Sequence, residues 1–242
     1  MNPDNALHWS QLSKMRSTPQ DYIHYMTEGF GKPTPAMEFG TAVDAIVFGT
    51  TDRLAVFTGK VRNGKVWEAF KAEHAGQEIV TQATWDAAGE AAAAVLTNTE
   101  AATILDGAKC QQFLRWKQGG RDCAGTMDIS GRVLAELKVT DPNPRKFYWH
   151  GMKMGWHCQL AWYYDGLIAA GHPEPESVHI IAVRPKPPHV VTVFDLDDSM
   201  LDLGRKEYHL ALERLRICED ADYWPGYVEG ISVWSAPDEE AA

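Results

Sequence analysis

The distribution of apolar and polar positions along the chain predicts helices and strands in a mixed order. Short, strongly apolar or alternating segments are typical of β-strands, and five of them occur, at residues 112–116, 123–129, 133–139, 178–183 and 190–194. Longer segments with helical spacing cover residues 17–26, 37–48, 84–96, 154–169 and 197–218, and Ser10 can cap a short helix before them. This order predicts an α/β protein of the α+β type, with a central mixed β-sheet flanked by helices.

The length and composition of the chain fit a single domain. With 242 residues and 45% hydrophobic content it can bury one substantial core, and no linker rich in Pro, Ser or Gly divides it. We expect a core over residues 36–196, an N-terminal helical segment over residues 7–30, and a C-terminal helix and tail over residues 197–242. The chain has no run of 18 apolar residues and no secretory leader pattern, which predicts a cytoplasmic protein without a membrane partner.

The cysteine and histidine positions do not favour a zinc site. Cys110, Cys123, Cys158 and Cys218 lack C-x-x-C spacing, which argues against a zinc ribbon and a disulfide framework and favours buried thiols. His157 lies near the start of a predicted helix, but the sequence shows no i,i+4 His pair and no third ligand at a suitable spacing.

Two carboxylates and one lysine fall within one predicted hairpin. Asp128 lies near the end of the strand at residues 123–129, and Glu136 and Lys138 lie on the next strand. Alternate side chains of a strand leave on the same face, so Glu136 and Lys138 point together while Leu137 points into the core. Carboxylate oxygens bind hard divalent cations and a lysine can face a phosphate, so this arrangement suggests a divalent-metal nuclease.

The hairpin also has a simpler interpretation, as a surface hairpin with a Glu and a Lys on its solvated face. Its turn raises a geometric question as well. If Ser130 and Gly131 formed a tight two-residue turn, Asp128 would lie opposite Val133, and Glu136 would lie three positions further along the strand. Convergence on one metal would then need strong twist, a bulge or a different register, and the sequence leaves these three alternatives open.

The motifs together resemble the PD-(D/E)XK nuclease superfamily, and within it the RecE-type branch (exonuclease VIII) and lambda exonuclease. In that group an acidic residue closes one strand, acidic-x-Lys follows on the next strand, and a helix with Gln-x-x-x-Tyr comes after, as Gln159 and Tyr163 do here. Upstream, the helical start at residues 9–13 and a Gly-x-x-x-Asp segment ending at Asp44 match a helical start and a Gly-x-x-x-His helix of the family. The similarity runs from about Leu7 to Tyr164, and more loosely to residues 224–227.

The resemblance implies a set of site residues. Asp128, Glu136 and the carbonyl of Leu137 would bind Mg²⁺, with Mn²⁺ as a substitute. Asp44 stands where the family has His; it is a further candidate ligand and adds negative charge, which leaves the identity of the third ligand open. Lys138 would orient the attacking water and stabilise charge, and Gln159 would position that water or the scissile phosphate.

The resemblance also implies an activity and partners. It implies an exonuclease that degrades one strand of linear double-stranded DNA in the 5′ to 3′ direction, leaving single-stranded tails for recombination of the phage type. Its partners would be double-stranded DNA ends, a single-strand annealing protein and further copies of the chain in a trimer or tetramer. The alternatives are a non-catalytic DNA-end or protein-binding module and an endonuclease or Cas4-like relative; the cysteine spacing argues against the iron–sulfur cluster of the last.

The net charge of −10 and the sequence pI near 5.3 oppose DNA binding, because affinity for DNA depends on Lys and Arg. Basic residues nevertheless cluster at Lys14 with Arg16, at residues 145–146 and at Lys153, and a bound metal would reverse the charge of the acidic site. Ser10 and Ser13, near Lys14, are candidates for holding a terminal phosphate at a helix N-terminus. Tyr163 is a candidate for base stacking, although packing in the core explains most of the aromatic residues around it. No G-x-x-x-x-G-K-[ST] loop occurs, so the chain does not couple its own ATP hydrolysis to unwinding.

Overall fold

A mixed β-sheet forms the centre of the protein, in a computed structural model that describes residues 5–29 and 31–234. Within these residues the sheet has six strands, in the order β1, β5, β6, β7, β8, with β4 also paired to β5. Pairing is parallel for β1–β5 and β6–β7 and antiparallel for β4–β5, β5–β6 and β7–β8. The strands are β1 (Leu7–His8), β4 (Lys109–Gln118), β5 (Arg121–Ser130), β6 (Val133–Val139), β7 (Ser177–Val183) and β8 (Val191–Asp195).

The predicted architecture, a central mixed sheet flanked by helices, is confirmed. Each of the five predicted strands corresponds to one of β4 to β8. Caps explain several helix starts, since the side chains of Thr34, Thr81 and Asp197 each accept a hydrogen bond from a backbone N–H of the first turn that follows. The helices at the predicted positions are α2 (Pro19–Glu28), α3 (Pro35–Val47), α5 (Gln82–Thr97), α8 (Trp156–Ala169) and α9 (Asp198–Ala221).

The structure corrects two predicted helix starts. The helix expected from residue 154 begins at Trp156, because Gly155 takes a left-handed conformation (φ 73°) and separates α8 from a further helix, α7 (Pro144–Met154). Ser10 does not cap a helix but lies inside α1 (Trp9–Leu12), where Gln11 Oε1 accepts a hydrogen bond from the backbone N–H of His8.

Several elements were not predicted from the sequence. They include a two-stranded parallel sheet of β2 (Leu54–Phe57) and β3 (Glu78–Thr81). The others are β1, α4 (Gly64–Glu73), α6 (Thr99–Leu105), α7 and the 3₁₀ helices η1 (Ser13–Arg16) and η2 (Thr51–Arg53). Most of these elements are short or lack a clear apolar face, which is why the hydrophobic pattern did not indicate them.

Helices cover the two faces of the sheet with separate apolar cores. On one face, Leu134 and Ile180 pack with Trp162 of α8 and Tyr208 of α9. On the other, Leu137, Ile181 and Ile129 pack with the small side chains of α3 and α5, such as Ala42, Val43, Ala88 and Ala91. Alternation along β6 therefore directs Leu134 and Glu136 to the α8 side and Leu137 to the α3 side.

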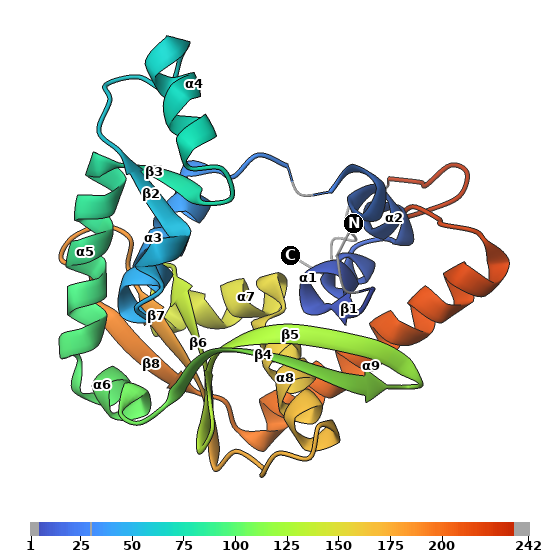
Figure 1. Ribbon diagram of the computed structural model, residues 1–242. Helices are drawn as coiled ribbons and strands as arrows, with labels where there is room; N and C mark the ends of the chain where they lie inside the picture. Colours follow the sequence, from blue (N-terminus) through green and yellow to red (C-terminus); the bar gives the residue numbers. More distant parts are fainter. Residues whose placement is uncertain (1–4, 30, 235–242) are drawn as a thin grey trace.

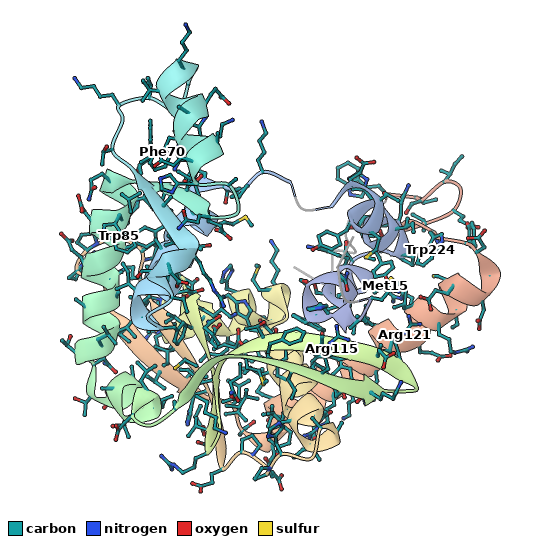
Figure 2. All side chains as sticks on the ribbon, in the orientation of Figure 1. Met15, Phe70, Trp85, Arg115, Arg121 and Trp224 are labelled. Carbon is teal, nitrogen blue, oxygen red and sulfur yellow. The ribbon has the colours of Figure 1, made fainter. Side chains whose placement is uncertain are left out.

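The ribbon has two arms that rise from the sheet (Figure 1). One arm contains α3, α4, α5, β2 and β3, and the other contains α1, α2 and the C-terminal end of α9. Figure 2 shows Phe70 and Trp85 in the first arm and Met15 and Trp224 in the second, where Trp224 stacks on Tyr22 with 5.5 Å between ring centroids. Arg121, at the tip of the β4–β5 hairpin, pairs with Glu219 of α9 and so ties the hairpin to the second arm.

Among the helices in residues 5–29 and 31–234, none is both long enough and apolar enough to cross a membrane. Residue 30 of the expected N-terminal segment and residues 235–242 of the expected C-terminal tail lie outside the described residues.

Candidate active site

The register of β5 against β6 decides where the two carboxylates meet. Ile129 pairs with Ala135, so Asp128 lies opposite Glu136 and not opposite Val133. The tight two-residue turn at Ser130 and Gly131 is therefore not the connection, and the register differs from the one that such a turn would give. The alternation of β5 is also broken at Asp128, because Met127 lies in the core on the α8 side and Ile129 in the core on the α3 side. Residues that lie directly opposite one another in an antiparallel pair share a face of the sheet, so the two acidic side chains can approach one another.

Asp128 is held by groups from the two neighbouring strands, β4 and β6. Its Oδ2 accepts a hydrogen bond from the backbone N–H of Leu137 (3.0 Å), and its own N–H donates to Glu136 Oε1 (3.5 Å). Its Oδ1 accepts from Gln111 Nε2 (3.0 Å). Gln111 has a left-handed backbone (φ 51°) between the ladder pairs on either side of it, which marks a local distortion of β4. Nothing in the sequence indicated Gln111 as a site residue.

Glu136 is the centre of the hydrogen-bond network. Its side chain is buried, with 2% of the residue exposed, and Oε2 accepts hydrogen bonds from Lys138 Nζ (2.8 Å) and Gln159 Nε2 (3.0 Å). Lys138 lies two residues along the same strand, and Gln159 comes from α8, which packs on this face of the sheet. The structure thus brings together Asp128, Glu136, Lys138 and Gln159 from two strands and one helix.

Tyr163 lies one helical turn after Gln159 and packs inside the protein. Its hydroxyl accepts a hydrogen bond from Gln159 Nε2 (3.5 Å), and the residue is only 7% exposed. Its ring lies over Gly125 so closely that a Cβ at that position would come within 2.4 Å of Tyr163 Cε1. The prediction that Tyr163 stacks on a DNA base does not fit this position, because neither face of the buried ring is open to a base.

Asp44 of α3 reaches the same region from the opposite side. It lines a small cavity of about 180 Å³ together with Thr41, Gln111 and Asp128. Burial raises the pKa of Asp44 well above its ordinary value, and the nearby carboxylates of Asp128 and Glu136 raise it further while Lys138 opposes them. Asp44 is therefore close enough to the pair to interact with it electrostatically.

The electrostatics of the site show an excess of negative charge. Burial, followed by the charge of Asp128, raises the pKa of Glu136 to about 7. Burial disfavours the charged form of Lys138, but the carboxylates of Glu136 and Asp128 outweigh that effect and raise the pKa of Lys138 above its ordinary value. In the metal-free protein these carboxylates therefore favour the ammonium form of Lys138.

The donor types at this site suit a hard divalent cation. Within the described residues, however, Asp44, Asp128 and Glu136 are not a group whose ligand atoms all lie within 4.8 Å of one another, so a shared ion would require a shift of these side chains. One ammonium group faces the carboxylates of Asp44, Asp128 and Glu136, and carboxylate oxygens are the ligands that Mg²⁺ prefers. The backbone of Leu137 lies at the same site, because the Leu137 N–H donates a hydrogen bond to Asp128. A cation there would offset the surplus negative charge and favour the ionised form of each carboxyl group.

A separate group of metal-binding side chain types lies between α8 and α9. His157, Cys158 and Glu207 are, within the described part of the chain, the group whose ligand atoms all lie within 4.8 Å of one another. This set, which includes nitrogen and sulfur ligands, would suit zinc better than magnesium. The sequence did not indicate it, because Glu207 lies on α9, about 50 residues after His157 and Cys158. Arg16 Nη2, however, lies 3.0 Å from Glu207 Oε2, so a cation is already present on that carboxylate.

Most of the predicted phosphate-binding residues line one large cavity. Ser13, Lys14, Arg16 and Lys153 border a cavity of about 880 Å³ between η1, α2, α7 and α9. His24 of α2 and Arg214 of α9 also line the cavity. The sequence did not indicate either as a phosphate-binding residue, because both lie on the polar faces of their helices. Ser10 lies outside this lining, where its carbonyl accepts a hydrogen bond from Ser13 Oγ (3.2 Å).

Arg16 is held by contacts within the protein. Its guanidinium donates to Glu207 Oε2 from Nε (3.2 Å) and Nη2 (3.0 Å), and to the carbonyl of Met152 (2.9 Å) at the C-terminal end of α7. These bonds use N–H donors that would otherwise contact a phosphate. Arg16 therefore ties η1 to α7 and α9. Lys14 and Lys153 also line the cavity, and Lys14 Nζ lies 5.1 Å from the centre of the Tyr25 ring.

Comparison with known proteins places this geometry in context. The model of a family described as "PDDEXK-like domain of unknown function (DUF3799)" matches residues 9–237. A crystal structure of a protein described as "Putative exonuclease", from Eubacterium rectale, has a similar fold, with a TM-score of 0.64 and 14% identity over 98% of this chain and 91% of that chain. At that identity the likeness shows the fold alone. No curated protein matched the chain.

Proposed function

Because the chain belongs to this family of PDDEXK-like domains, within the PD-(D/E)XK nuclease superfamily, we propose that it is a magnesium-dependent exonuclease acting on linear double-stranded DNA. The observation that carries the proposal is the convergence of Asp128, Glu136 and Lys138, with Gln159 bonded to the same carboxylate. This set combines oxygen ligands for a cation, a positive charge and an amide that can position water.

Each residue of the site has a distinct task in this proposal. Asp128, Glu136 and the carbonyl of Leu137 would hold Mg²⁺, or Mn²⁺ in its place, with Asp44 as a further candidate ligand. Such an ion would supply Lewis acidity at the scissile phosphate. Lys138, beside Glu136, orients the attacking water and stabilises the charge that develops on the phosphate oxygens. Gln159 fixes the direction of the Glu136 carboxylate and positions the water.

The basic cavity supports action at a DNA end. Lys14 and Lys153, with Arg214 and Ser13, line a space large enough for a phosphate group and the nucleotide attached to it. We assign the binding of a terminal phosphate to this cavity. Ser10 supports it indirectly, through the hydrogen bond from Ser13 to its carbonyl, and Arg16 supports it by fixing η1 against α7.

The remaining features of the proposal rest on the resemblance to RecE-type and lambda exonucleases. They are removal of nucleotides in the 5′ to 3′ direction, assembly into a homo-oligomer of three or four copies, and cooperation with a single-strand annealing protein. A closed assembly would let an acidic protein stay on DNA with modest affinity in each subunit.

The test is degradation of linear duplex DNA labelled at either 5′ or 3′ end, with Mg²⁺ and with EDTA. We expect Mg²⁺-dependent release of label, and loss of that release in Glu136→Gln and Lys138→Ala. The matched controls are Glu176→Gln and Lys117→Ala, which change the same residue types at exposed positions. Circular dichroism and melting temperature confirm that each variant is folded, and retained activity in both site variants would remove the mechanism.

The same experiment separates the alternatives. Cutting of covalently closed plasmid identifies an endonuclease. Absence of cleavage, together with absence of Mg²⁺ or Mn²⁺ binding in a titration, identifies a non-catalytic binding module. In that case Asp44, in place of the His of the family, would be a mark of a lost active site.

A further inference from the structure

Helix α7 differs in charge from the rest of the chain. The chain has a net charge of −10, yet the eleven residues of α7 contain Arg145, Lys146 and Lys153 and no Asp or Glu. The same helix contains Tyr148 and Trp149, whose rings make an edge contact with 4.9 Å between centroids. Basic residues interleaved with exposed aromatic residues are typical of surfaces that bind single-stranded nucleic acid.

The inner face of α7 fixes the helix in place. Phe147 is buried and stacks on Phe194 of β8, with ring centroids 3.7 Å apart and planes 4° apart. Gly151 lies against Trp156, where a Cβ would come within 3.1 Å of the indole ring. Asn143 caps the helix by accepting a hydrogen bond from the backbone N–H of Arg145. The helix is therefore rigid, and its other face needs no contact with the core.

The outer face of α7 consists of Lys146, Trp149, His150 and Lys153, at positions i, i+3, i+4 and i+7; of these, His150 also makes an edge contact with the ring of Trp156, with 5.1 Å between centroids. All four residues are exposed, and 72% of Trp149 is accessible to solvent. Burying such a large ring in the core would stabilise the fold, so a Trp left at the surface between two lysines is available to another molecule.

The position of α7 links this face to the candidate active site. The helix follows β6, which contains Glu136 and Lys138, and precedes α8, which contains Gln159. In the view of Figure 1 it lies between α3 and α1. Its C-terminal residues Lys153 and Met154 line the large basic cavity with Lys14. Lys153 thus belongs both to the outer face of α7 and to the lining of that cavity.

We propose that the outer face of α7 binds single-stranded DNA, with a base stacked on Trp149 and phosphates paired with Lys146 and Lys153. The two lysines are seven residues apart, about 10 Å along the helix, so they can contact phosphates on either side of a stacked base. This inference rests on the proposed function and deepens it, because it names a strand-binding surface outside the carboxylate site.

Charge favours a nucleic acid over a protein as the partner. Within α7, three cationic side chains have no acidic residue to balance them; Lys146 comes no closer than 4.0 Å to Asp141, and both of these side chains are largely exposed. A polyanion removes that repulsion, and it would gain stacking energy from Trp149 as well. An interface between copies of this acidic chain would gain stacking without comparable charge complementarity.

The test is the affinity for a fluorescently labelled single-stranded oligodeoxynucleotide, measured by anisotropy in EDTA so that no strand is cut. We expect Trp149→Ala to weaken binding about 10-fold and Trp149→Phe to retain most of it, because stacking needs an aromatic ring. Lys146→Ala combined with Lys153→Ala should reduce the slope of log K against log salt by about 1.4, which corresponds to two lost phosphate contacts. Tyr223→Ala, an exposed aromatic residue at the end of α9, and Lys117→Ala are the controls.

The outcomes separate this inference from the proposed function. Unchanged affinity in Trp149→Ala, or an equal loss in Tyr223→Ala, overturns the inference even if the nuclease is active. A change of oligomeric state in Trp149→Ala with unchanged DNA affinity also overturns it, because the face would then bind another copy of the chain. Weaker DNA binding by Trp149→Ala in a protein without nuclease activity supports the inference and counts against the proposed function alone.

Discussion

The carboxylate of Asp128 accepts a hydrogen bond from the backbone of β6, and the carboxylate of Glu136 accepts one from the backbone of β5. The N–H of Asp128 donates to Glu136 Oε1, and Asp128 Oδ2 accepts from the N–H of Leu137, the residue after Glu136. This reciprocal pair holds two acidic groups together across β5 and β6 at a point where their charges repel. Such an arrangement costs free energy in the folded protein unless a cation offsets it, which connects the geometry of the pair to metal binding.

Replacing Asp44 with Asn should stabilise the metal-free protein. Folding raises the pKa of the Asp44 carboxyl group. Such a group contributes stability at low pH, and this contribution is lost as the pH rises from the pKa of the unfolded chain through the pKa of the folded protein. At pH 8 the Asn variant should therefore have a larger free energy of unfolding than the native protein in EDTA, measured by urea denaturation. Mg²⁺ should raise the melting temperature of the native protein and raise that of the variant much less. Equal Mg²⁺ responses would show that Asp44 takes no part in binding the ion.

Gly125→Ala should destabilise the protein and impair the site together. The added Cβ would lie 2.4 Å from the Tyr163 ring, so that ring must move, and with it the Gln159 side chain that donates to its hydroxyl. We expect a loss of about 1 to 3 kcal/mol in unfolding free energy, measured by urea denaturation. Gly89→Ala is the control, since that helical position has open space around it and Ala favours helices by about 1 kcal/mol. A tolerated Gly125→Ala would mean that Tyr163 is free to shift.

Burial of His157 predicts a loss of stability in acid. Burial lowers the pKa of His157 below its ordinary value, although Glu207 opposes this effect. The unfolded chain therefore binds a proton more readily, and stability should fall as pH drops below about 6.5, by at most about 1.4 kcal/mol per pH unit from this group. The variant His157→Gln should show a smaller slope of unfolding free energy against pH. His179 has the same direction of shift but is present in both proteins, so identical slopes would contradict the prediction.

Arg16 and Glu207 should be coupled in stability. The pair is partly buried, and the guanidinium also bonds to the carbonyl of Met152, so removal of Arg16 leaves several groups without a partner. A double-mutant cycle with Arg16→Ala and Glu207→Gln should give a coupling energy of about 1 kcal/mol. The pair Arg216 and Glu213, exposed on α9, is the control and should give a value near zero to about 0.5 kcal/mol. A coupling no larger than that of the control would favour a direct role of Arg16 in DNA binding.

The sequence alone determined five strands, five of the helices and two side-chain pairs of the site. Strand alternation placed Glu136 and Lys138 together, and the structure has their side chains 2.8 Å apart. Helical spacing placed Gln159 and Tyr163 on one face of α8, where Gln159 donates to the Tyr163 hydroxyl. These features depend on backbone periodicity, which operates over a few residues and is therefore visible in the sequence.

Tertiary structure decided the rest. The register that sets Asp128 opposite Glu136 depends on which faces of β5 and β6 are buried, and a turn sequence does not determine that. The positions of Asp44, Gln111 and Glu207 depend on helices and strands that are distant in sequence and meet only in the packed core. The burial of Tyr163 follows from the absence of a side chain at Gly125, a complementarity of two surfaces that no local pattern contains.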